Sequence, residues 1–190
     1  MAKNTKCLFT DGANTENVTN KYNVILADPP WKYARDMHDG SRSTDHYPSM
    51  ELADMKALDV PSLVDDECVL FMWTTGPKMN WAIELGQSWG FQYSQVAFVW
   101  DKMRTLAGCY TITECEFVLV FKHKRKRTPK RFKTNARQFF QEKPREHSRK
   151  PEYVQDMIDL MYPHAKKIEL FARRSKNGWD TWGNETTKFD

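Results

Sequence analysis

Short apolar runs alternate with helical patterns along the chain, and this alternation most constrains its fold. Continuous runs of four to eight apolar residues are typical of buried strands, whereas apolar residues three or four positions apart are typical of helices. Strands that alternate with helices favour an α/β domain with a largely parallel sheet flanked by helices. Strands are expected at residues 24–27, 68–73, 95–100, 116–121 and 167–172.

Three helices are expected between these strands, and each has its own end signals. Ser49 is placed to cap a helix over residues 49–60, with acidic residues in the first turn. The pattern over residues 77–90 stops at Gly90, a residue that commonly follows a helix C-terminus. Pro151 is expected at the first position of a helix over residues 150–163, because that position has no backbone donor to lose.

The first predicted strand ends in an unusual way, in the stretch "VILADPPWKY" at residues 24–33. Two readings are open for this stretch. Pro29 and Pro30 can simply stop the strand, because proline donates no hydrogen bond to a sheet. In parallel α/β sheets, however, ligands bind beyond the carboxyl ends of the strands, and Asp28 lies at such an end. Its position therefore favours a functional role.

Composition excludes several classes of protein. The 190 residues are 40% hydrophobic, which suits one domain with a substantial core. No apolar run approaches the roughly 20 residues of a membrane span, and no signal peptide is expected. The four cysteines form no C-x-x-C pair, so neither a metal site nor a disulfide framework is expected. We expect the protein to be in a reducing cytoplasm. The eight glycines form neither G-x-G-x-x-G nor a P-loop, which argues against nicotinamide and triphosphate cofactors.

Positive charge is concentrated in one segment, "KHKRKRTPKRFK" at residues 122–133. It holds eight Lys or Arg and no acid, and without it 21 basic residues face 25 acidic ones. Such a run can be a solvated loop or a phosphate-binding patch. The second reading predicts nucleic-acid contacts from Lys124, Arg125, Lys126, Arg127, Lys130, Arg131 and Lys133.

The residues around Asp28 suit chemistry on an exocyclic amine. The lone pair of such an amine is delocalised into the aromatic ring, which makes it a poor nucleophile. Acceptors on its two N–H bonds free the lone pair, and the Asp28 carboxylate and the Pro29 carbonyl can supply both. Trp31 or Tyr33 can stack on the base. Positioning and polarisation then account for most of the rate.

The motif "DPPW" after a hydrophobic strand resembles that of amino-group methyltransferases that use S-adenosylmethionine (SAM). The chain is similar to the family of the catalytic subunit of the eukaryotic mRNA adenosine methyltransferase and its bacterial and phage relatives. "YPSMELADMKALDVPSLVDDECVLFMWTT", "TECEFVLVFKHK", "PREHSRKPEYVQDMIDLMYP" and "KIELFARRSKNGWDTWGNE" match in the same order. The resemblance covers residues 22–186 and so nearly the whole chain.

The resemblance implies a Rossmann-like SAM-dependent methyltransferase domain in which the catalytic motif precedes the SAM-binding segment. It implies that Asp28, Pro29, Pro30 and Trp31 form the catalytic motif. Tyr47, Glu114, Arg145 and Lys150 would line the substrate pocket. Arg173, Asn184, Glu185, Asp28, Lys150 and Asp11 would hold the cofactor. The match departs from the family at Arg174, Ser175 and Lys176, and at Glu185 in place of glutamine.

The expected activity is SAM-dependent methylation of the N6 amine of adenine in DNA. The family's N-terminal zinc-finger and helical extensions have no counterpart in this chain, which suggests a minimal bacterial or phage form acting in the cytoplasm. RNA adenine, cytosine N4 and a non-catalytic nucleic-acid-binding subunit remain alternatives. The polar loop at residues 33–50 and the segments at 103–112 and 122–146 are expected to surround the opening to the base. The protein is expected to be a monomer or a homodimer.

Overall fold

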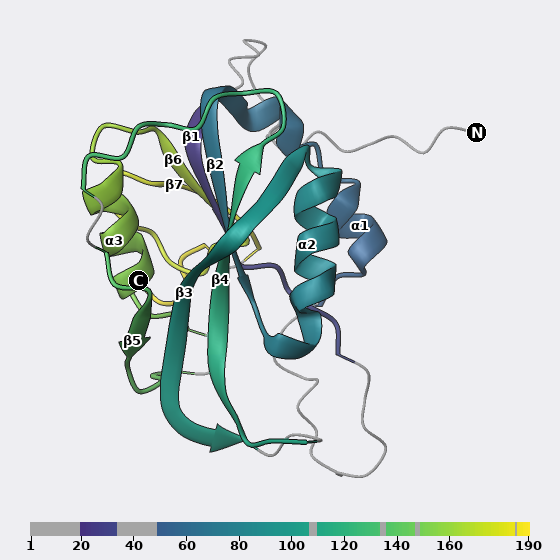
Figure 1. The fold of residues 1–190 in the computed structure, drawn as a ribbon, viewed down its shortest axis with the longest axis vertical. Helices are drawn as coiled ribbons and strands as arrows, with labels where there is room; N and C mark the ends of the chain where they lie inside the picture. Colours follow the sequence, from purple (N-terminus) through teal and green to yellow (C-terminus); the bar gives the residue numbers. More distant parts are fainter. Residues whose placement is uncertain (1–19, 34–48, 107–109, 134–135, 147–148, 185) are drawn as a thin grey trace.

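A seven-stranded sheet organises the chain, in the strand order β5-β3-β4-β2-β1-β6-β7 (Figure 1). The computed structural model describes residues 20–33, 49–106, 110–133, 136–146, 149–184 and 186–190. The strands are β1 (Tyr22–Ala27), β2 (Val64–Thr74), β3 (Phe91–Leu106), β4 (Thr113–His123), β5 (Phe139–Gln141), β6 (Lys167–Leu170) and β7 (Asp180–Trp182). The helices are α1 (Leu52–Lys56), α2 (Met79–Ser88) and α3 (Tyr153–Met161), with 3₁₀ turns at Val60–Leu63 and Gly76–Lys78.

The predicted α/β class is confirmed, and the sheet is mixed. Strand β1 pairs in parallel with β2 and β6, β6 with β7, and β3 with β5. Strand β4 is antiparallel to both β2 and β3. The five predicted strands are present. Strands β5 and β7 were not predicted, because three residues are too few to show a period.

Two helix starts were predicted wrongly. Helix α1 spans only five residues, and Glu51 rather than Ser49 precedes it, with no side-chain hydrogen bond at the cap. Helix α3 begins at Tyr153 after Glu152, so Pro151 lies outside its first position. The end of α2 near Gly90 is confirmed: the helix finishes at Ser88, and Gly90 follows with a φ of 89°.

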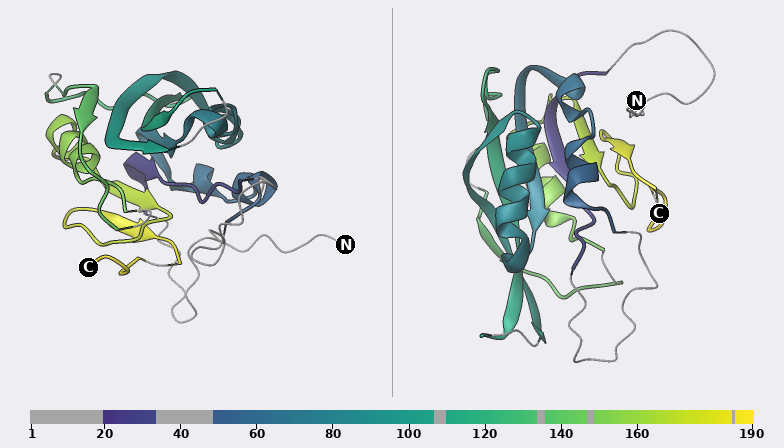
Figure 2. Two further views of the ribbon diagram at one scale, coloured as in Figure 1. Left: turned by 90° about the horizontal axis from the view of Figure 1, so that it is seen from below. Right: turned by 90° about the vertical axis from the view of Figure 1, so that its right-hand side faces the viewer.

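Both faces of the sheet are covered, which explains the continuous apolar run of β1. Ile25 and Ala27 face one core, which α1 and α2 complete with residues such as Met55 and Leu85. Val24 and Leu26 face the other core, which α3 completes through Val154, Ile158 and Met161. Figure 2 shows helices on the two sides of the sheet. Alternate side chains of a strand point to opposite faces, so a strand buried on both faces must be apolar throughout.

The direction of the parallel strands distinguishes two ends of the sheet. We call the end where these strands begin the amino edge and the end where they finish the carboxyl edge. At the carboxyl edge β1 ends at Ala27 and β2 at Thr74, and β6 ends close by at Leu170. The chain leaves β4 at His123, which pairs with Phe91 at the start of β3. His123 therefore lies at the amino edge, where the parallel strands begin. In the described part of the chain, no helix has the length and apolar character needed to cross a membrane.

Candidate active site

Asp28 directly follows β1 at the carboxyl edge of the sheet. Its backbone N–H donates to the carbonyl of Leu170 at 3.2 Å, which ties it to the end of β6. The residue is only 8% exposed. A buried carboxylate needs a charged partner or hydrogen-bond donors, because burial removes its hydration. The surroundings of Asp28 supply that partner.

Lys150 is the partner of Asp28. Its Nζ lies 3.0 Å from Asp28 Oδ1 and 3.6 Å from Glu116 Oε2. On the far side, Lys102 Nζ lies 3.3 Å from Glu116 Oε1. Four charges of alternating sign thus form a chain from β3 through β4 to the end of β1. The Lys150 ammonium also lies 5.7 Å from the centre of the Trp73 ring.

The pKa shifts of this chain follow from its geometry. Burial alone would lower the pKa of Lys150, but the negative charges of Asp28 and Glu116 outweigh it and raise that pKa. Burial would raise the pKa of Glu116, but Lys150 and Lys102 outweigh it and lower that pKa. Lys150 therefore stays cationic at neutral pH, and a cationic lysine cannot act as a base.

The prolines and the tryptophan fix the chain beyond Asp28. The N–H of Trp31 donates to the Pro29 carbonyl at 2.9 Å, and the N–H of Met50 donates to the Pro30 carbonyl at 3.0 Å. The Trp31 indole is buried and donates to the carbonyl of Trp73 at 3.3 Å. Trp31 therefore anchors the motif in the core that α1 and α2 cover. The Trp31 N–H engages one lone pair of the Pro29 carbonyl, and that oxygen carries a second lone pair.

Tyr33 is better placed than Trp31 to contact a base. It is 50% exposed, and its hydroxyl group lies 2.7 Å from Thr75 Oγ1. Burial of the hydroxyl group raises the pKa of Tyr33, and the charges of Glu116, Lys150 and Asp28 act on it as well. An exposed ring beside the Asp28 carboxylate is a suitable stacking surface.

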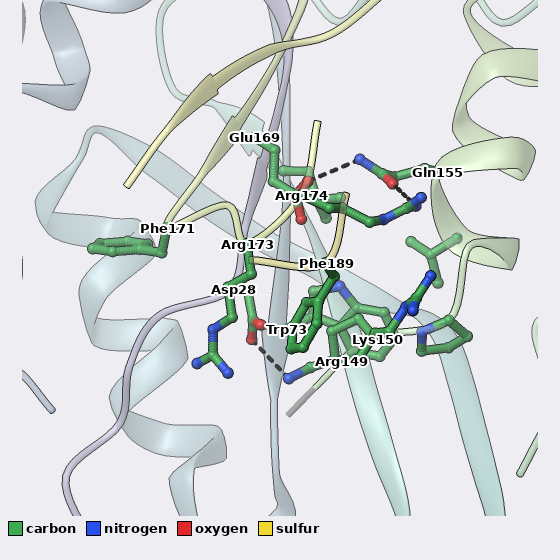
Figure 3. A pocket seen from close by; sticks show the side chains of 13 residues that line it. Asp28, Trp73, Arg149, Lys150, Gln155, Glu169, Phe171, Arg173, Arg174 and Phe189 are labelled. Atoms are coloured by element: carbon green, nitrogen blue, oxygen red, sulfur yellow. Dashed lines mark hydrogen bonds and ion pairs between the residues drawn. The ribbon is translucent and has the colours of Figure 1, made fainter. Parts of the chain in front are cut away.

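A pocket opens next to Asp28, between the start of α3 and the segment that follows β6 (Figure 3). Helix α3 supplies Val154 and Gln155, and β6 supplies Glu169. The residues that complete its polar and aromatic lining are Trp73, Arg149, Lys150, Phe171, Arg173, Arg174 and Phe189. The pocket thus combines cations, the two buried acids Asp28 and Glu169, and aromatic rings.

Glu169 is the second buried acid of this pocket. Its Oε2 accepts a hydrogen bond from Gln155 Nε2 at 2.9 Å, and Gln155 Oε1 in turn accepts one from Arg174 (Figure 3). Burial raises the pKa of Glu169 to about 7, and the negative charge of Asp28 acts in the same direction. Glu169 can thus accept or donate a hydrogen bond near neutral pH.

The structure brings some predicted site residues together and leaves others apart. Asp28, Lys150 and Arg173 line the pocket. Glu114 and Asn184 are exposed and do not line it. Arg145 is exposed and forms ion pairs with Glu142 at 3.1 Å and with Glu152 at 3.4 Å. The predictions for Asp11, Tyr47 and Glu185 lie outside the described residues.

The basic segment does not surround the pocket as expected. Its first half begins at His123 on the amino edge, and the Arg127 carbonyl accepts a hydrogen bond from the N–H of Cys68, close to the start of β1. Residues 124–133 therefore lie at the amino ends of the strands, and Asp28 lies at the opposite, carboxyl ends. The expectation was wrong for residues 124–133 because β4 is antiparallel to β2, which carries the chain to the amino edge. Residues 141 and 142, from the later part of the expected segment, lie beside Asp101 at the carboxyl edge.

Three residues of the site were not predicted. Glu116 lies two positions after Glu114, so both side chains point to the same face of β4, and only the one nearer the sheet centre reaches Lys150. Glu169 was detectable as the one acid within the apolar run "KIELFA". Phe189 follows the family match, and its N–H donates to the Arg173 carbonyl at 3.1 Å.

Comparisons with known proteins identify a family and several relatives of this chain. The MT-A70 family profile matches residues 22–185. The Type II methyltransferase M.MunI of Mycoplasma sp is 46% identical over 200 residues, which cover 96% of this chain and 85% of that protein.

More distant relatives are longer proteins. The N(6)-adenosine-methyltransferase MT-A70-like protein of Arabidopsis thaliana is 28% identical over 89% of this chain, and the match covers 24% of that protein. The N(6)-adenosine-methyltransferase catalytic subunit METTL3 of Homo sapiens is also 28% identical over 89% of the chain, with 29% of that protein covered. Because the family profile spans most of the sequence and the 46% identity extends over most of both chains, this protein is a methyltransferase of the MT-A70 family.

Proposed function

We propose that the protein transfers a methyl group from SAM to the exocyclic N6 amine of adenine in DNA. The observation that carries this proposal is the position of Asp28, a buried carboxylate at the carboxyl end of β1 that lines a pocket and directly precedes the Pro29 carbonyl. Two acceptors next to each other suit an amine with two N–H bonds. The family assignment independently supports methyl transfer.

The pocket residues fit SAM, on which MT-A70 methyltransferases depend. Lys150, Arg149 and Arg173 offer cations to a carboxylate, and Glu169 with Gln155 offers acceptors and donors to hydroxyl groups. Phe171 and Phe189 offer apolar surface to an adenine ring. When bound, SAM supplies a methyl group activated by a positively charged sulfur.

The protein residues then have distinct tasks. Asp28 and the Pro29 carbonyl accept the two N–H bonds of the amine and direct its lone pair toward the cofactor. An amine that accepts a methyl group would lose one proton, and the Asp28 carboxylate or water could take it. Lys150 holds the carboxylate of Asp28 in place without accepting that proton, because it remains cationic. Orientation and electrostatics supply the rate.

Two relatives support the choice of substrate. The match to a Type II methyltransferase covers 85% of that protein, whereas the match to N(6)-adenosine methyltransferases covers about a quarter of theirs. The first comparison favours DNA, and the second favours the N6 position of adenine. RNA adenine is the second candidate, because the more distant relatives are named for adenosine methylation.

The test is methyl transfer from labelled SAM to duplex DNA, single-stranded DNA and RNA, followed by mass analysis of the digested nucleosides. N6-methyladenine from DNA is expected. N4-methylcytosine, or methylation of RNA alone, would replace the proposal with another substrate. If the protein binds DNA but neither binds SAM nor transfers a methyl group, a non-catalytic subunit would be favoured.

A matched pair of variants tests the assigned role of Asp28. Asp28→Asn should reduce methyl transfer by about 10²-fold or more, because an amide offers one acceptor oxygen and no negative charge. Asp54→Asn changes an exposed aspartate of α1 and should leave the rate unchanged. A wild-type rate in Asp28→Asn would refute the role.

A further inference from the structure

The chain beyond β4 follows the outside of the sheet from one edge to the other. It crosses the amino edge over residues 124–133 and then descends to β5, the edge strand beside β3 (Figure 1). Strand β5 is parallel to β3 and ends at Gln141, which pairs with Asp101. The chain thus arrives back at the carboxyl edge, where Lys150 meets Asp28. This path connects the amino edge to the pocket.

Basic side chains lie along the whole of this path. We name them the basic strip, and all of them are exposed. Within the described residues, none of them forms an ion pair with an acid. Its members are Lys124, Arg125, Lys130, Arg131, Lys133, Arg137 and Lys143.

Neighbouring cations in the same segment are neutralised. Lys126 Nζ lies 2.6 Å from Asp66 Oδ1, and Arg127 forms an ion pair with Glu67 at 3.1 Å. These two cations have an acid within reach, whereas the members of the basic strip form no ion pair within the described residues. The unpaired members retain their full attraction for an anion.

The backbone beneath the strip is fixed at several points. The N–H of Lys124 donates to the Gly90 carbonyl at 3.1 Å, and the N–H of Phe132 donates to the Met161 carbonyl at 2.8 Å. The Tyr153 hydroxyl donates to the Arg137 carbonyl at 3.1 Å. A ligand therefore meets cations that are already gathered, and it loses less entropy on binding than it would with a free loop.

The length of the strip suits one flank of a nucleic acid. Val24 pairs with Val69, next to the Arg127 contact, and lies four positions before Asp28. That separation is about 13 Å along the strand. At about 3.4 Å per base pair, it corresponds to roughly four base pairs. A duplex whose target base reaches Asp28 can therefore lie along the strip on one side only.

We propose that the basic strip holds the backbone phosphates of one flank of the substrate duplex, on the side of the sheet formed by β5. This inference rests on the proposed function for the position of the target base. A polyanion with regularly spaced charges matches a row of unpaired cations that continues from one edge to the other. Phe132 and Phe139 are 72% and 53% exposed beside these cations and can contact the sugars between phosphates.

The decisive measurement is affinity for duplexes that are shortened on one side. The duplex carries one acceptor adenine, since its partner strand is already methylated. Leaving about two base pairs on the strip side should weaken binding about tenfold, and the same cut on the other side should change it less than about twofold. Equal losses on the two sides would overturn the proposal.

Two double variants of equal charge provide the matched control. Lys130→Gln with Arg131→Gln removes two unpaired cations of the strip, whereas Lys126→Gln with Arg127→Gln removes two paired ones from the same segment. The first pair should weaken binding of the long duplex about tenfold and lower the slope of log K against log salt by roughly two. It should leave the duplex lacking the strip-side flank unaffected. The second pair should have less than about twofold effect.

The outcomes separate this proposal from the proposed function. Methyl transfer to the short duplex should be unchanged in Lys130→Gln with Arg131→Gln, because these residues lie outside the pocket. If no DNA is methylated, the proposed function fails, and the difference in salt slope between the double variants on any long duplex still tests the strip. If the basic strip binds an acidic protein instead of DNA, the two double variants should bind each duplex with the same affinity as each other, and that result would refute the proposal.

Discussion

Lys150 Nζ lies 3.0 Å from Asp28 Oδ1, and the two side chains come from the start of the α3 segment and the end of β1. Residues 122 positions apart thus form one ion pair at the carboxyl edge. The pair is largely buried, with 18% and 11% of the two side chains exposed. Removing one partner of a buried pair leaves the other charge uncompensated, which is more costly than the pair itself is stabilising.

Lys150→Met should therefore reduce methyl transfer strongly. Without the ammonium, Asp28 and Glu116 face each other as two buried carboxylates, and Asp28 is no longer held toward the amine. A loss of about 10²-fold in kcat is expected. Lys150→Arg keeps the charge and should recover part of that loss. Steady-state kinetics with labelled SAM provide the measurement, and thermal unfolding shows whether each variant folds. Equal activity in Lys150→Met and Lys150→Arg would contradict the role of the charge.

The two glutamates of β4 should differ in importance. Glu116 contacts Lys150 and Lys102, whereas Glu114 is exposed. Glu116→Gln should lower kcat/KM by about tenfold or more because it unbalances the chain of alternating charges. Glu114→Gln should stay within about twofold of the wild type. The family resemblance placed Glu114 in the substrate pocket and did not name Glu116, so kinetics of the two variants side by side decide between the resemblance and the geometry.

The sequence predicted the sheet class and Asp28 because both depend on local patterns. Residues 24–27 of β1 are all apolar since each face of the strand is buried there, and Asp28 follows directly at the end of that run. Short strands such as β7 escaped prediction because they exist only by pairing with a neighbour. A three-residue segment has no period of its own.

The partners of Asp28 were harder to predict, because they depend on pairing direction. Lys150 was predicted from the family resemblance alone, without its contact to Glu116. The choice between Glu114 and Glu116 depends on the register of β4 against β2, in which Phe117 lies opposite Thr74. The basic segment was misplaced for a related reason, since nothing in its composition reveals that β4 runs antiparallel. The distances between residues on different strands depend on the order and direction of those strands. The local sequence pattern carries little information about either.

Glu169, which is buried in the pocket, should make the free energy of unfolding depend on pH. Burial raises the pKa of Glu169 to about 7 from an ordinary value near 4.5. Between these values the folded state binds more protons than the unfolded state, so the free energy of unfolding falls as pH rises. The contribution is complete below about pH 4.5 and is lost as pH passes 7. A shift of this size corresponds to about 3 kcal/mol.

Glu169→Gln tests this dependence, since glutamine carries no titrating proton. Urea unfolding at pH 5 and pH 8 should show a smaller loss of stability in the variant than in the wild type, by about 2–3 kcal/mol. Glu114→Gln, an exposed glutamate on β4, serves as the control and should follow the wild type. Parallel curves for Glu169→Gln and the wild type would rule out Glu169 as the titrating group.

Gly183 should control the shape of the pocket segment after β6. A Cβ at this position would lie 2.9 Å from both the N and O atoms of Ala172 and 3.0 Å from the carbonyl carbon of Phe171. The Ala172 N–H donates to the Trp182 carbonyl at 3.0 Å, which holds the two backbone segments together. A Cβ at Gly183 would therefore clash with backbone atoms that cannot rotate away. Gly183→Ala should cost about 1–3 kcal/mol of stability and displace the segment that carries Phe171 and Arg173. Calorimetric SAM binding should weaken in this variant, whereas Gly76→Ala, where a Cβ meets nothing within 4 Å, should bind as the wild type does. Unchanged stability and unchanged binding in Gly183→Ala would show that the segment can move without loss of the pocket.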